Sequence, residues 1–338
     1  MHGLLLAAGL STRLGALSEQ RPKPLLPVCN HSLLRWGACH LGSGVEDLVV
    51  NLHHLGQQIE ADLGGGAALG LRVRYSREPE ILGTGGGIKQ MAAMLPRGRC
   101  VVANAKIVTD LDLEELLAFH ERAGAMATLV VRPDEHAERW GAIRVDDAGR
   151  VTGILEARAP GTGEDAPRQF TGIHVLEPEL VDAIPDAPPA VRCVIRTAYT
   201  ELLERGAPIA GYLHRGYFYD HSTPARYLQG NLNLLSGAAA PAHAPGPLTG
   251  LDPTAEIDRA AAIGREVLVG PGARVEADVR LGPGVVVGQG ARVTRGTRLR
   301  ESIVWPGVTA DRSGARLVFT PRGPVEVPVA ADPAASPR

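Results

Sequence analysis

Residues near the amino end combine the features of a phosphate-binding site. The run from Gly3 to Gly15 indicates a buried strand that ends in a loop of small residues, and the backbone N–H groups of such a loop can approach an anion closely. Arg13 adds a guanidinium that can donate two hydrogen bonds to one phosphate. Lys23 stands between two prolines, which restrict the backbone on either side of the cation. A strand, a glycine loop and a rigid lysine in this order predict phosphate binding rather than a solvated basic surface.

The elements that must position this loop follow an alternating pattern. From residue 1 to about 232, short aliphatic runs alternate with helical patterns, which predicts a Rossmann-like α/β fold with a mixed, mostly parallel sheet and helices on both faces. Strands are expected at residues 4–7, 45–52, 71–75 and 100–103, and helices at residues 33–41, 57–63 and 84–95. Residues 140–155 differ, because two β-rich runs flank a turn at Asp146–Gly149, and they predict an antiparallel hairpin.

The carboxyl-terminal third of the chain has a period of six. An aliphatic residue recurs at every sixth position from Ile257 to Leu299, and the position four residues after each of them is small or β-branched. A β-sandwich would show a period of two instead. The pattern closely resembles that of hexapeptide-repeat proteins, which form a left-handed β-helix. Residues 257–304 would then make between two and three coils of such a helix.

These patterns predict four segments. Residues 1–235 would form the α/β domain, and residues 256–320 would form the small β-helix. Residues 236–255 are expected to be a linker, because their first part is mostly Ala, Pro and Gly with few large side chains to bury. Residues 321–338 are rich in Pro and Ala and are expected to be a frayed tail.

Composition excludes several classes of function. The 338-residue chain has a net charge of −2, so it offers no basic field for nucleic acid or for an anionic membrane. Aromatic residues make up 4% of the chain, too few for a platform that stacks single strands. The first apolar run is too short to span a bilayer and lacks the features of a signal peptide. Because the four cysteines are scattered without C-x-x-C spacing, we expect a cytoplasmic protein with reduced thiols.

Five motifs resemble those of the sugar-nucleotide pyrophosphorylases, the nucleotidyltransferases that make nucleotide sugars. The amino-terminal run resembles their L-A-A-G-x-G-T-R-L motif followed by P-K-P-L. The other four motifs lie at residues 82–87, 104–113, 170–178 and 216–224. The resemblance spans residues 3–232 and is strongest to mannose-1-phosphate guanylyltransferase-like members, which also carry a β-helix.

The resemblance implies that a sugar 1-phosphate oxygen attacks the α-phosphate of a nucleoside triphosphate and expels pyrophosphate, with charge neutralisation as the main catalytic task. It assigns the α-phosphate to Lys23 and the leaving pyrophosphate to Arg13. Glu80 would accept hydrogen bonds from guanine, or would be an exposed loop acid, so GTP is favoured while UTP or dTTP remain possible. The expected nucleotide-binding residues are Ala8, Gly9, Ser11, Thr12, Glu80, Gly83, Thr84, Gly85 and Gly86. The expected sugar-phosphate-binding residues are Asn104, Glu156, Arg158 and Gly172.

Two positions depart from the family pattern. The family holds Mg²⁺ between two acids, of which the second is present as Asp220, whereas Lys106 occupies the position of the first. An ammonium cannot ligate Mg²⁺. One hypothesis is that Lys106 pairs with Asp220 as a tethered cation in place of the metal, because a buried carboxylate needs a counter-charge. The other is loss of activity. Ala157 also replaces the lysine of the sugar-phosphate motif, where Arg158 would be a partial substitute.

Two functions remain open at this point. The chain could be an active sugar-1-phosphate nucleotidyltransferase, or a regulatory homologue that binds a sugar nucleotide and pairs with an active paralogue. Acyl transfer by the β-helix is disfavoured because residues 257–304 contain no histidine. We expect no nucleic acid or membrane partner. Because the open β edges of a short coil need covering, the β-helix would pack on the α/β domain or mediate oligomers, and a homodimer is favoured.

Overall fold

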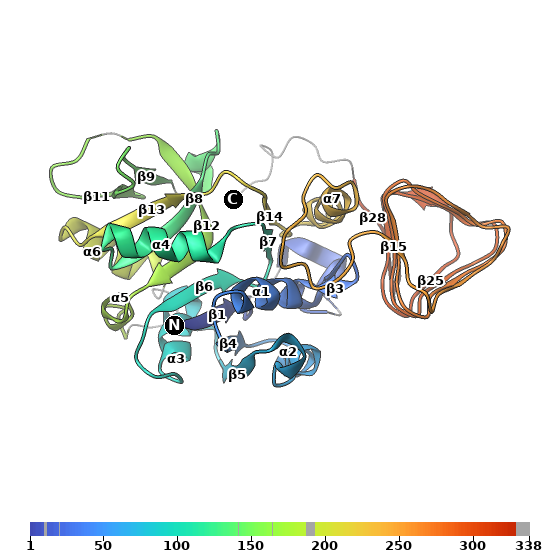
Figure 1. Ribbon diagram of the computed structural model, residues 1–338, viewed down its shortest axis with the longest axis horizontal. Helices are drawn as coiled ribbons and strands as arrows, with labels where there is room; N and C mark the ends of the chain where they lie inside the picture. The colour runs from blue at the N-terminus through green and yellow to red at the C-terminus, as the bar shows by residue number, and fades with distance from the viewer. Residues whose placement is uncertain (10–11, 20, 141, 164, 187–192, 329–338) are drawn as a thin grey trace. The chain divides into compact units, whose positions relative to one another are not determined.

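The chain divides into two compact units. The computed structural model describes residues 1–338 apart from 10–11, 20, 141, 164, 187–192 and 329–338 (Figure 1). The first unit comprises Met1–Leu10 and Gly37–Phe218, and the second comprises Ser11–Trp36 and Tyr219–Arg338. The second unit therefore groups a short amino-terminal segment with the hexapeptide region. Among the helices of the described residues, none is long and apolar enough to cross a membrane.

A mixed sheet is the centre of the first unit. Its strands are β1 (His2–Leu6), β4 (Asp47–Leu52), β5 (Arg72–Arg77), β6 (Cys100–Asn104), β8 (Ala127–Arg132), β9 (Ile143–Val145), β10 (Val151–Ile154), β11 (Ala157–Arg158), β12 (Pro167–Leu176) and β13 (Ile209–Leu213), and β7 (Ile107–Thr109) lies outside it. The main path runs β11-β10-β9-β12-β6-β1-β4-β5, while β8 joins β12 to β13. Strands β1, β4, β5 and β6 are parallel. Strand β12 is antiparallel to β6, and the predicted hairpin is formed by antiparallel β9 and β10.

Helices cover both faces of this sheet, as the sequence predicted. They are α1 (Leu33–Gly42), α2 (Gly56–Leu63), α3 (Gly83–Ala92), α4 (Leu113–Ala123), α5 (Pro178–Asp182) and α6 (Thr200–Glu204), with short helical turns η3 (Ala67–Leu69), η4 (Ala137–Trp140) and η6 (Ile195–Tyr199). Leu4 of β1 belongs to the same apolar core as Ile88 of α3. A Cβ placed on Gly37 of α1 would lie 2.9 Å from Leu5 Cδ1. Since successive strand residues point to opposite faces, α1 and α3 cover opposite faces of β1.

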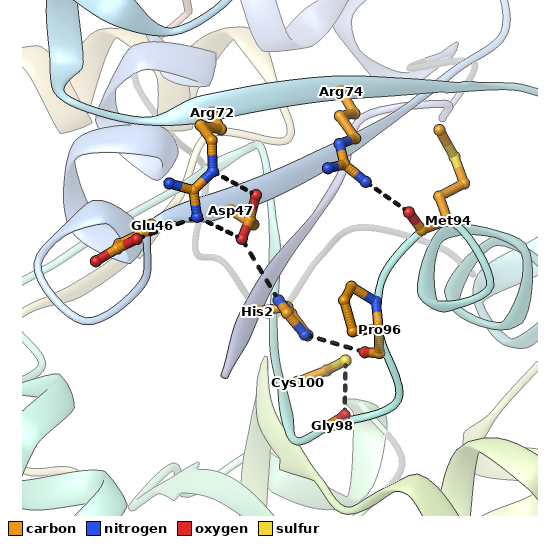
Figure 2. Close-up of polar contacts among 9 residues, drawn as sticks. All are labelled: His2, Glu46, Asp47, Arg72, Arg74, Met94, Pro96, Gly98 and Cys100. Atoms are coloured by element: carbon orange, nitrogen blue, oxygen red, sulfur yellow. Dashed lines mark hydrogen bonds and ion pairs between the residues drawn. The ribbon is translucent and has the colours of Figure 1, made fainter.

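Charged side chains meet at the amino ends of β4 and β5 (Figure 2). Arg72 donates from Nε and Nη2 to the two carboxylate oxygens of Asp47, at 2.9 and 2.8 Å, and from Nη2 to Glu46 at 3.1 Å. The hydrogen bonds from Arg72 lower the pKa of Asp47. His2 Nδ1 lies 4.0 Å from the same carboxylate. Arg72 and Glu46 form the solvent-exposed side of this network.

The hexapeptide region of the second unit is a three-sided coil of parallel strands, seen as a triangle in Figure 1. One side stacks β15 (Gly250–Leu251), β18 (Val267–Val269), β21 (Val285–Val287), β24 (Ser302–Val304) and β27 (Leu317–Thr320). The second side stacks β16 (Glu256–Ile257), β19 (Arg274–Val275), β22 (Arg292–Val293) and β25 (Thr309–Ala310). The third side stacks β17 (Ala262–Ile263), β20 (Arg280–Leu281), β23 (Arg298–Arg300) and β26 (Gly314–Ala315).

The coil extends further than the period-six analysis indicated. Its first rung, at β15, lies inside the expected linker, and four strands stack on each of the other two sides, so the coil extends beyond residues 257–304, for which two to three coils were counted. The repeat also shortens along the coil. Val267 pairs with Val285, but Val285 pairs with Ser302, one residue short of the eighteen-residue repeat. Tighter turns break the register of six while the inward side chains stay buried, as Val304 shows.

The tail is also more ordered than expected. Strand β28 (Gly323–Glu326) pairs antiparallel with β27, and Val327 is only 3% exposed. A strand of opposite direction covers the hydrogen-bonding edge that the last rung would otherwise leave open, which explains why residues that look frayed in sequence are ordered here. The rest of the expected tail, residues 329–338, lies outside the described residues.

The remaining elements of the second unit precede the coil in sequence. They are η1 (Thr12–Leu17), η2 (Lys23–Leu25), β2 (Pro27–Val28), β3 (His31–Ser32), β14 (Phe218–Asp220), whose first residue belongs to the first unit, and α7 (Pro224–Leu235). Strands β2 and β3 form an antiparallel pair whose turn residues Cys29 and Asn30 have positive φ. Arg322, in the β27–β28 turn, donates to Glu19 at 2.5 Å.

Candidate functional site

The carboxyl ends of three parallel strands bring several predicted residues to one edge of the first unit's sheet. Leu5 of β1 is level with Val50 of β4, and Leu6 is level with Asn104 of β6. The loop after β1 carries Ala8, and the turn after β6 carries half-buried Lys106. Ligands of open α/β sheets bind at this edge, because the loops that follow parallel strands meet there.

A buried polar relay, which the sequence analysis missed, fixes the loop after β1. Asn51 Oδ1 accepts hydrogen bonds from the backbone N–H groups of Ala7, at 2.6 Å, and Ala8, at 3.3 Å. Its Nδ2 donates to Glu78 Oε1 at 2.8 Å, and Glu78 Oε2 accepts from the Leu82 N–H at 3.0 Å. Asn51 and Glu78 are each 3% exposed. The relay therefore ties the loop after β1 to the start of the glycine motif.

The glycine motif forms the first turns of α3. Gly83 has a φ of 70°, and the glycines at 85, 86 and 87 are buried. A Cβ on Gly87 would lie 2.8 Å from Glu78 Oε1 and 3.0 Å from Asn51 Nδ2, so the relay leaves no room for a side chain there. Thr84 Oγ1 accepts from the Val194 N–H at 3.1 Å.

The other members of this predicted set differ in exposure. Gly85 and Gly86 are buried within α3, whereas Glu80 and Thr84 are exposed. Gly9 is exposed too, and a Cβ there would meet nothing within 4 Å. Ser11 lies outside the described residues. An uncrowded Gly9 leaves the main chain of this loop open to close approach.

Two predicted sugar-phosphate residues are in contact. Gly172 has a φ of 83° and lies where the pairing of β12 with β8 shifts register. Asn104 Nδ2 donates to the Gly172 carbonyl at 3.3 Å, and a Cβ on Gly172 would lie 2.1 Å from that nitrogen. Both the backbone angle and the close approach of Asn104 therefore require glycine at this position.

The modified sugar-phosphate motif lies at β11. Glu156 is exposed, and Ala157, which replaces the family lysine, is 7% exposed. Arg158 Nη1 donates to the carbonyls of Leu155, at 2.7 Å, and Ala157, at 2.9 Å. One arm of the guanidinium is thus engaged with the backbone of its own turn, which orients the side chain.

In the second unit, the two predicted phosphate-binding cations, Arg13 and Lys23, differ in exposure. Arg13 is exposed in η1, as is its neighbour Thr12. Lys23 is 8% exposed and begins η2, where the Leu26 N–H donates to the Lys23 carbonyl at 3.0 Å. Pro22 has a φ of −61°, in keeping with the restricted backbone that the two prolines predicted. Lys23 is therefore a buried cation on a rigid turn.

Asp220 ends β14 and is half-buried. Its backbone carbonyl accepts from Arg226 Nε at 2.7 Å, and the Arg226 guanidinium lies 4.7 Å from the centroid of the Tyr219 ring. The Thr223 hydroxyl caps α7 by accepting from the Arg226 N–H at 3.2 Å. The start of α7 thus determines the backbone position of Asp220.

The donor set does not match the family's two-acid metal site. Lys106 stands at the position of one acid, and among the described residues no three or more His, Cys, Asp or Glu side chains gather as a metal site would require. Because an ammonium repels a cation, these residues do not fit bound Mg²⁺ in the family's manner, and we assign no chemical step to a metal. The proposed Lys106–Asp220 pair would join the two units and stays a prediction.

Comparisons with known proteins agree with these observations. Residues 2–237 match the family model described as nucleotidyl transferase, and residues 260–295 match the model of six bacterial transferase hexapeptide repeats. A mannose-1-phosphate guanylyltransferase from Mycobacterium tuberculosis is 31% identical over 80% of this chain and 77% of its own length. An N-acetylmuramate alpha-1-phosphate uridylyltransferase from Neisseria meningitidis is 32% identical over 54% of this chain and 78% of its own length.

A solved structure supports the fold. A Bacillus anthracis crystal structure, assigned as a glucose-1-phosphate thymidylyltransferase, has a TM-score of 0.59 over 68% of this chain and 94% of its own, at 18% identity. At that identity the likeness concerns the fold alone.

Proposed function

Because this chain belongs to the nucleotidyl transferase family, we propose that it transfers a nucleotidyl group from a nucleoside triphosphate to a sugar 1-phosphate, with GTP and mannose 1-phosphate as the preferred pair. The observation that carries the proposal is the Asn51–Glu78 relay, because it holds the loop after β1 and the glycine motif at the carboxyl edge of one sheet. The 31% identity to a guanylyltransferase supports the choice of substrates.

In the proposed reaction, an oxygen of the sugar phosphate forms a bond to the α-phosphorus. The bond from that phosphorus to the oxygen that bridges the α- and β-phosphates breaks, and pyrophosphate leaves with the electron pair. Lys23 neutralises charge on the α-phosphate, and Arg13 does so on the leaving group. Since little covalent chemistry falls to the protein, positioning and charge neutralisation supply the rate enhancement.

The remaining predicted residues divide between the two substrates. Backbone N–H groups from Gly9 to Thr12 bind phosphate oxygens, and Gly83–Gly86 lie against the nucleoside, with Glu80 accepting from guanine. Asn104, Glu156, Arg158 and Gly172 bind the sugar phosphate. The contact between Asn104 and Gly172 supports the last assignment, because one element fixes the other.

Pyrophosphate release tests this function. The wild-type protein is assayed with GTP, UTP and dTTP against mannose, glucose and N-acetylmuramate 1-phosphates. We expect Lys23→Ala to lower kcat/KM by about 100-fold or more. The matched control is Lys89→Ala, because Lys89 on α3 instead donates to the Ile184 carbonyl at 2.8 Å. Equal losses in the two variants, or the same rate for every nucleotide, would contradict the proposal.

Lys106 supports a second candidate, a homologue that binds the sugar nucleotide without catalysing its formation. The two candidates differ in what Lys106→Asp does. If Lys106 acts as a tethered cation, the wild type works without Mg²⁺ and the variant becomes metal-dependent. If the site is impaired, the wild type releases no pyrophosphate yet binds a nucleotide sugar in equilibrium dialysis, and the variant regains activity only with Mg²⁺.

A further inference from the structure

A buried aromatic pair links the coil to the segment that carries Lys23, within the second unit. Trp305 follows β24 of the coil, and Tyr227 lies on α7. The indole Nε1 of Trp305 donates to the Tyr227 hydroxyl at 3.1 Å, and that hydroxyl donates to the Pro27 carbonyl at 2.6 Å. Trp305 is 1% exposed and Tyr227 is fully buried. The hydroxyl is thus both acceptor and donor in a continuous connection from the coil to β2.

The same indole also contacts the chain ahead of Lys23. The Arg21 guanidinium lies 5.1 Å from the centroid of the Trp305 ring, a cation–π arrangement. Arg21 comes two residues before Lys23, and Pro27 comes four residues after it. Trp305 therefore contacts the lysine turn directly on one side, at Arg21, and through Tyr227 on the other side, at Pro27.

The hairpin after this turn is fixed by further contacts. The Cys29 N–H donates to Asn231 Oδ1 of α7 at 2.9 Å, and Asn231 Nδ2 donates to the Tyr227 carbonyl at 3.0 Å. Asn30 Nδ2 donates to the Val287 carbonyl of the coil at 3.2 Å. Because Cys29 and Asn30 both have positive φ, this turn keeps an uncommon conformation that its contacts with α7 and the coil support.

These contacts matter because the lysine turn has little secondary structure of its own. Its three-residue η2 is followed only by the two-residue strands β2 and β3. Such short elements lose conformational entropy on ordering without a sheet to compensate for it. A cation that must meet a phosphate needs an accurate position, and contacts from α7 and the coil supply that accuracy.

We propose that Trp305 and Tyr227 are positioning residues for Lys23, so that the β-helix takes part in nucleotide binding by holding the lysine turn in place. The part of this inference that concerns nucleotide rests on the proposed function. The part that concerns the conformation of the turn does not.

The experiment compares Trp305→Phe and Tyr227→Phe with Val293→Ala. Phenylalanine keeps a ring but loses the hydrogen bond, whereas Val293 is buried inside the coil, on β22, with no part in these contacts. Hydrogen exchange is followed at the N–H groups of Leu25 and Leu26, which close the lysine turn. We expect exchange there to rise about fivefold in both phenylalanine variants, the equivalent of one lost hydrogen bond, and to stay unchanged in Val293→Ala.

Kinetics supply the second readout. The KM for nucleotide is expected to rise about fivefold in both phenylalanine variants, with the KM for sugar phosphate unchanged. Arg21→Gln removes the cation–π contact without altering the core, so it remains informative if a phenylalanine variant fails to fold, and we expect a smaller change in the same direction.

The outcomes separate the two proposals. Unchanged exchange in Trp305→Phe, or an equal rise in Val293→Ala, overturns the positioning role. Faster exchange with an unchanged nucleotide KM in a protein that binds nucleotide overturns it as well. Faster exchange in a protein whose wild type binds no nucleotide supports the positioning of the turn and removes the proposed function instead.

Discussion

The two segments that carry predicted phosphate-binding residues are held by different means. After β1, the N–H groups of Ala7 and Ala8 are held by Asn51, and Asn51 in turn donates to Glu78 Oε1. Around Lys23, the support comes from Tyr227, which contacts Pro27 across 200 residues of sequence.

This difference has a physical origin. A loop at the end of a central strand has neighbouring strands whose side chains can reach it, so a short polar relay is sufficient. The lysine turn lies outside that sheet and needs support from α7 and the coil. The first arrangement therefore depends on the placement of charge and of donors and acceptors, whereas the second depends on the shape of two aromatic rings and on one hydroxyl. The Trp305 and Tyr227 variants test the second arrangement, and four experiments test the first unit, beginning with the largest expected effect.

Exchanging the charge within the relay is expected to have the largest effect. Asn51→Asp alone places two carboxylates together. Glu78→Gln alone turns the NH2 group of the new amide toward another donor, either the Asn51 amide or the Leu82 N–H. Each variant should therefore lose about 3 kcal/mol of unfolding free energy. The double variant restores every hydrogen bond, because the new carboxylate at position 51 accepts from the new amide at position 78. We expect urea unfolding to show recovery to within about 1 kcal/mol of the wild type. Additive losses in the double variant would show that the relay does not depend on complementary polarity.

Acid should weaken the first unit through His174. This side chain is 2% exposed on β12 and shares a 2.7 Å hydrogen bond with the Tyr199 hydroxyl, and burial lowers its pKa to about 3. The unfolded chain takes up the proton near pH 6.5, so the stability contributed by neutral His174 is complete above that pH and is lost progressively as pH falls toward 3.

Replacing His174 by Gln keeps a polar partner for Tyr199 and removes the titration. Between pH 7.5 and pH 5, the fall in unfolding free energy should therefore be about 2 kcal/mol smaller in the variant than in the wild type. Urea unfolding at the two pH values measures this difference. Parallel pH dependences would show that the His174 environment does not exclude the proton.

Alanine substitutions at Gly87 and Gly9 should have separate effects, the first on unfolding free energy and the second on nucleotide affinity. Gly87→Ala brings a methyl group against Glu78 and Asn51, at 2.8 and 3.0 Å, and we expect a loss of about 1–2 kcal/mol after the gain in helix propensity. Gly9→Ala meets nothing, so the unfolding free energy should not change while nucleotide affinity falls. Thermal unfolding and equilibrium dialysis on both variants check this. A Gly9→Ala protein with normal nucleotide affinity would remove the loop from the proposed site.

A substitution at the edge formed by the amino ends of the strands is expected to have the smallest effect. Asp47→Asn weakens the exposed network around Arg72 (Figure 2), and exposed ion pairs contribute little because water and salt screen them. Neither the urea midpoint nor the KM for nucleotide should shift measurably. A loss comparable to that of Asn51→Asp would mean that position along the sheet, rather than burial, determines the cost.

Periodic features of this chain could be predicted because each follows a repeated local rule. Alternating aliphatic and helical segments predicted the mixed sheet, its helices and the β9–β10 hairpin, and the period of six predicted the coil. Departures of the coil from its six-residue period could not be predicted in the same way. The shortened repeat after Val285 and the closing strand β28 depend on how the last coils complete their hydrogen bonds.

Residues of the candidate site divide in a similar manner. The glycine loop, the rigid lysine and the glycine motif have characteristic residue types at short spacing. Asn51 was missed because it lies in an otherwise aliphatic strand, and Glu78 because an acid before a glycine motif resembles a loop residue. The one available signal was an asparagine inside a run such as Asp47–Leu52, where an unpaired amide would be costly.

By itself, the sequence determined the two architectures and the residue types of the predicted nucleotide-binding motifs, since local spacing dictates which side chains a strand, a helix or a coil presents. Only the tertiary structure decided what holds those motifs. Asn51 meets Glu78, and Tyr227 meets Trp305, through contacts between residues far apart in the chain, and no local pattern specifies which buried polar groups will satisfy one another.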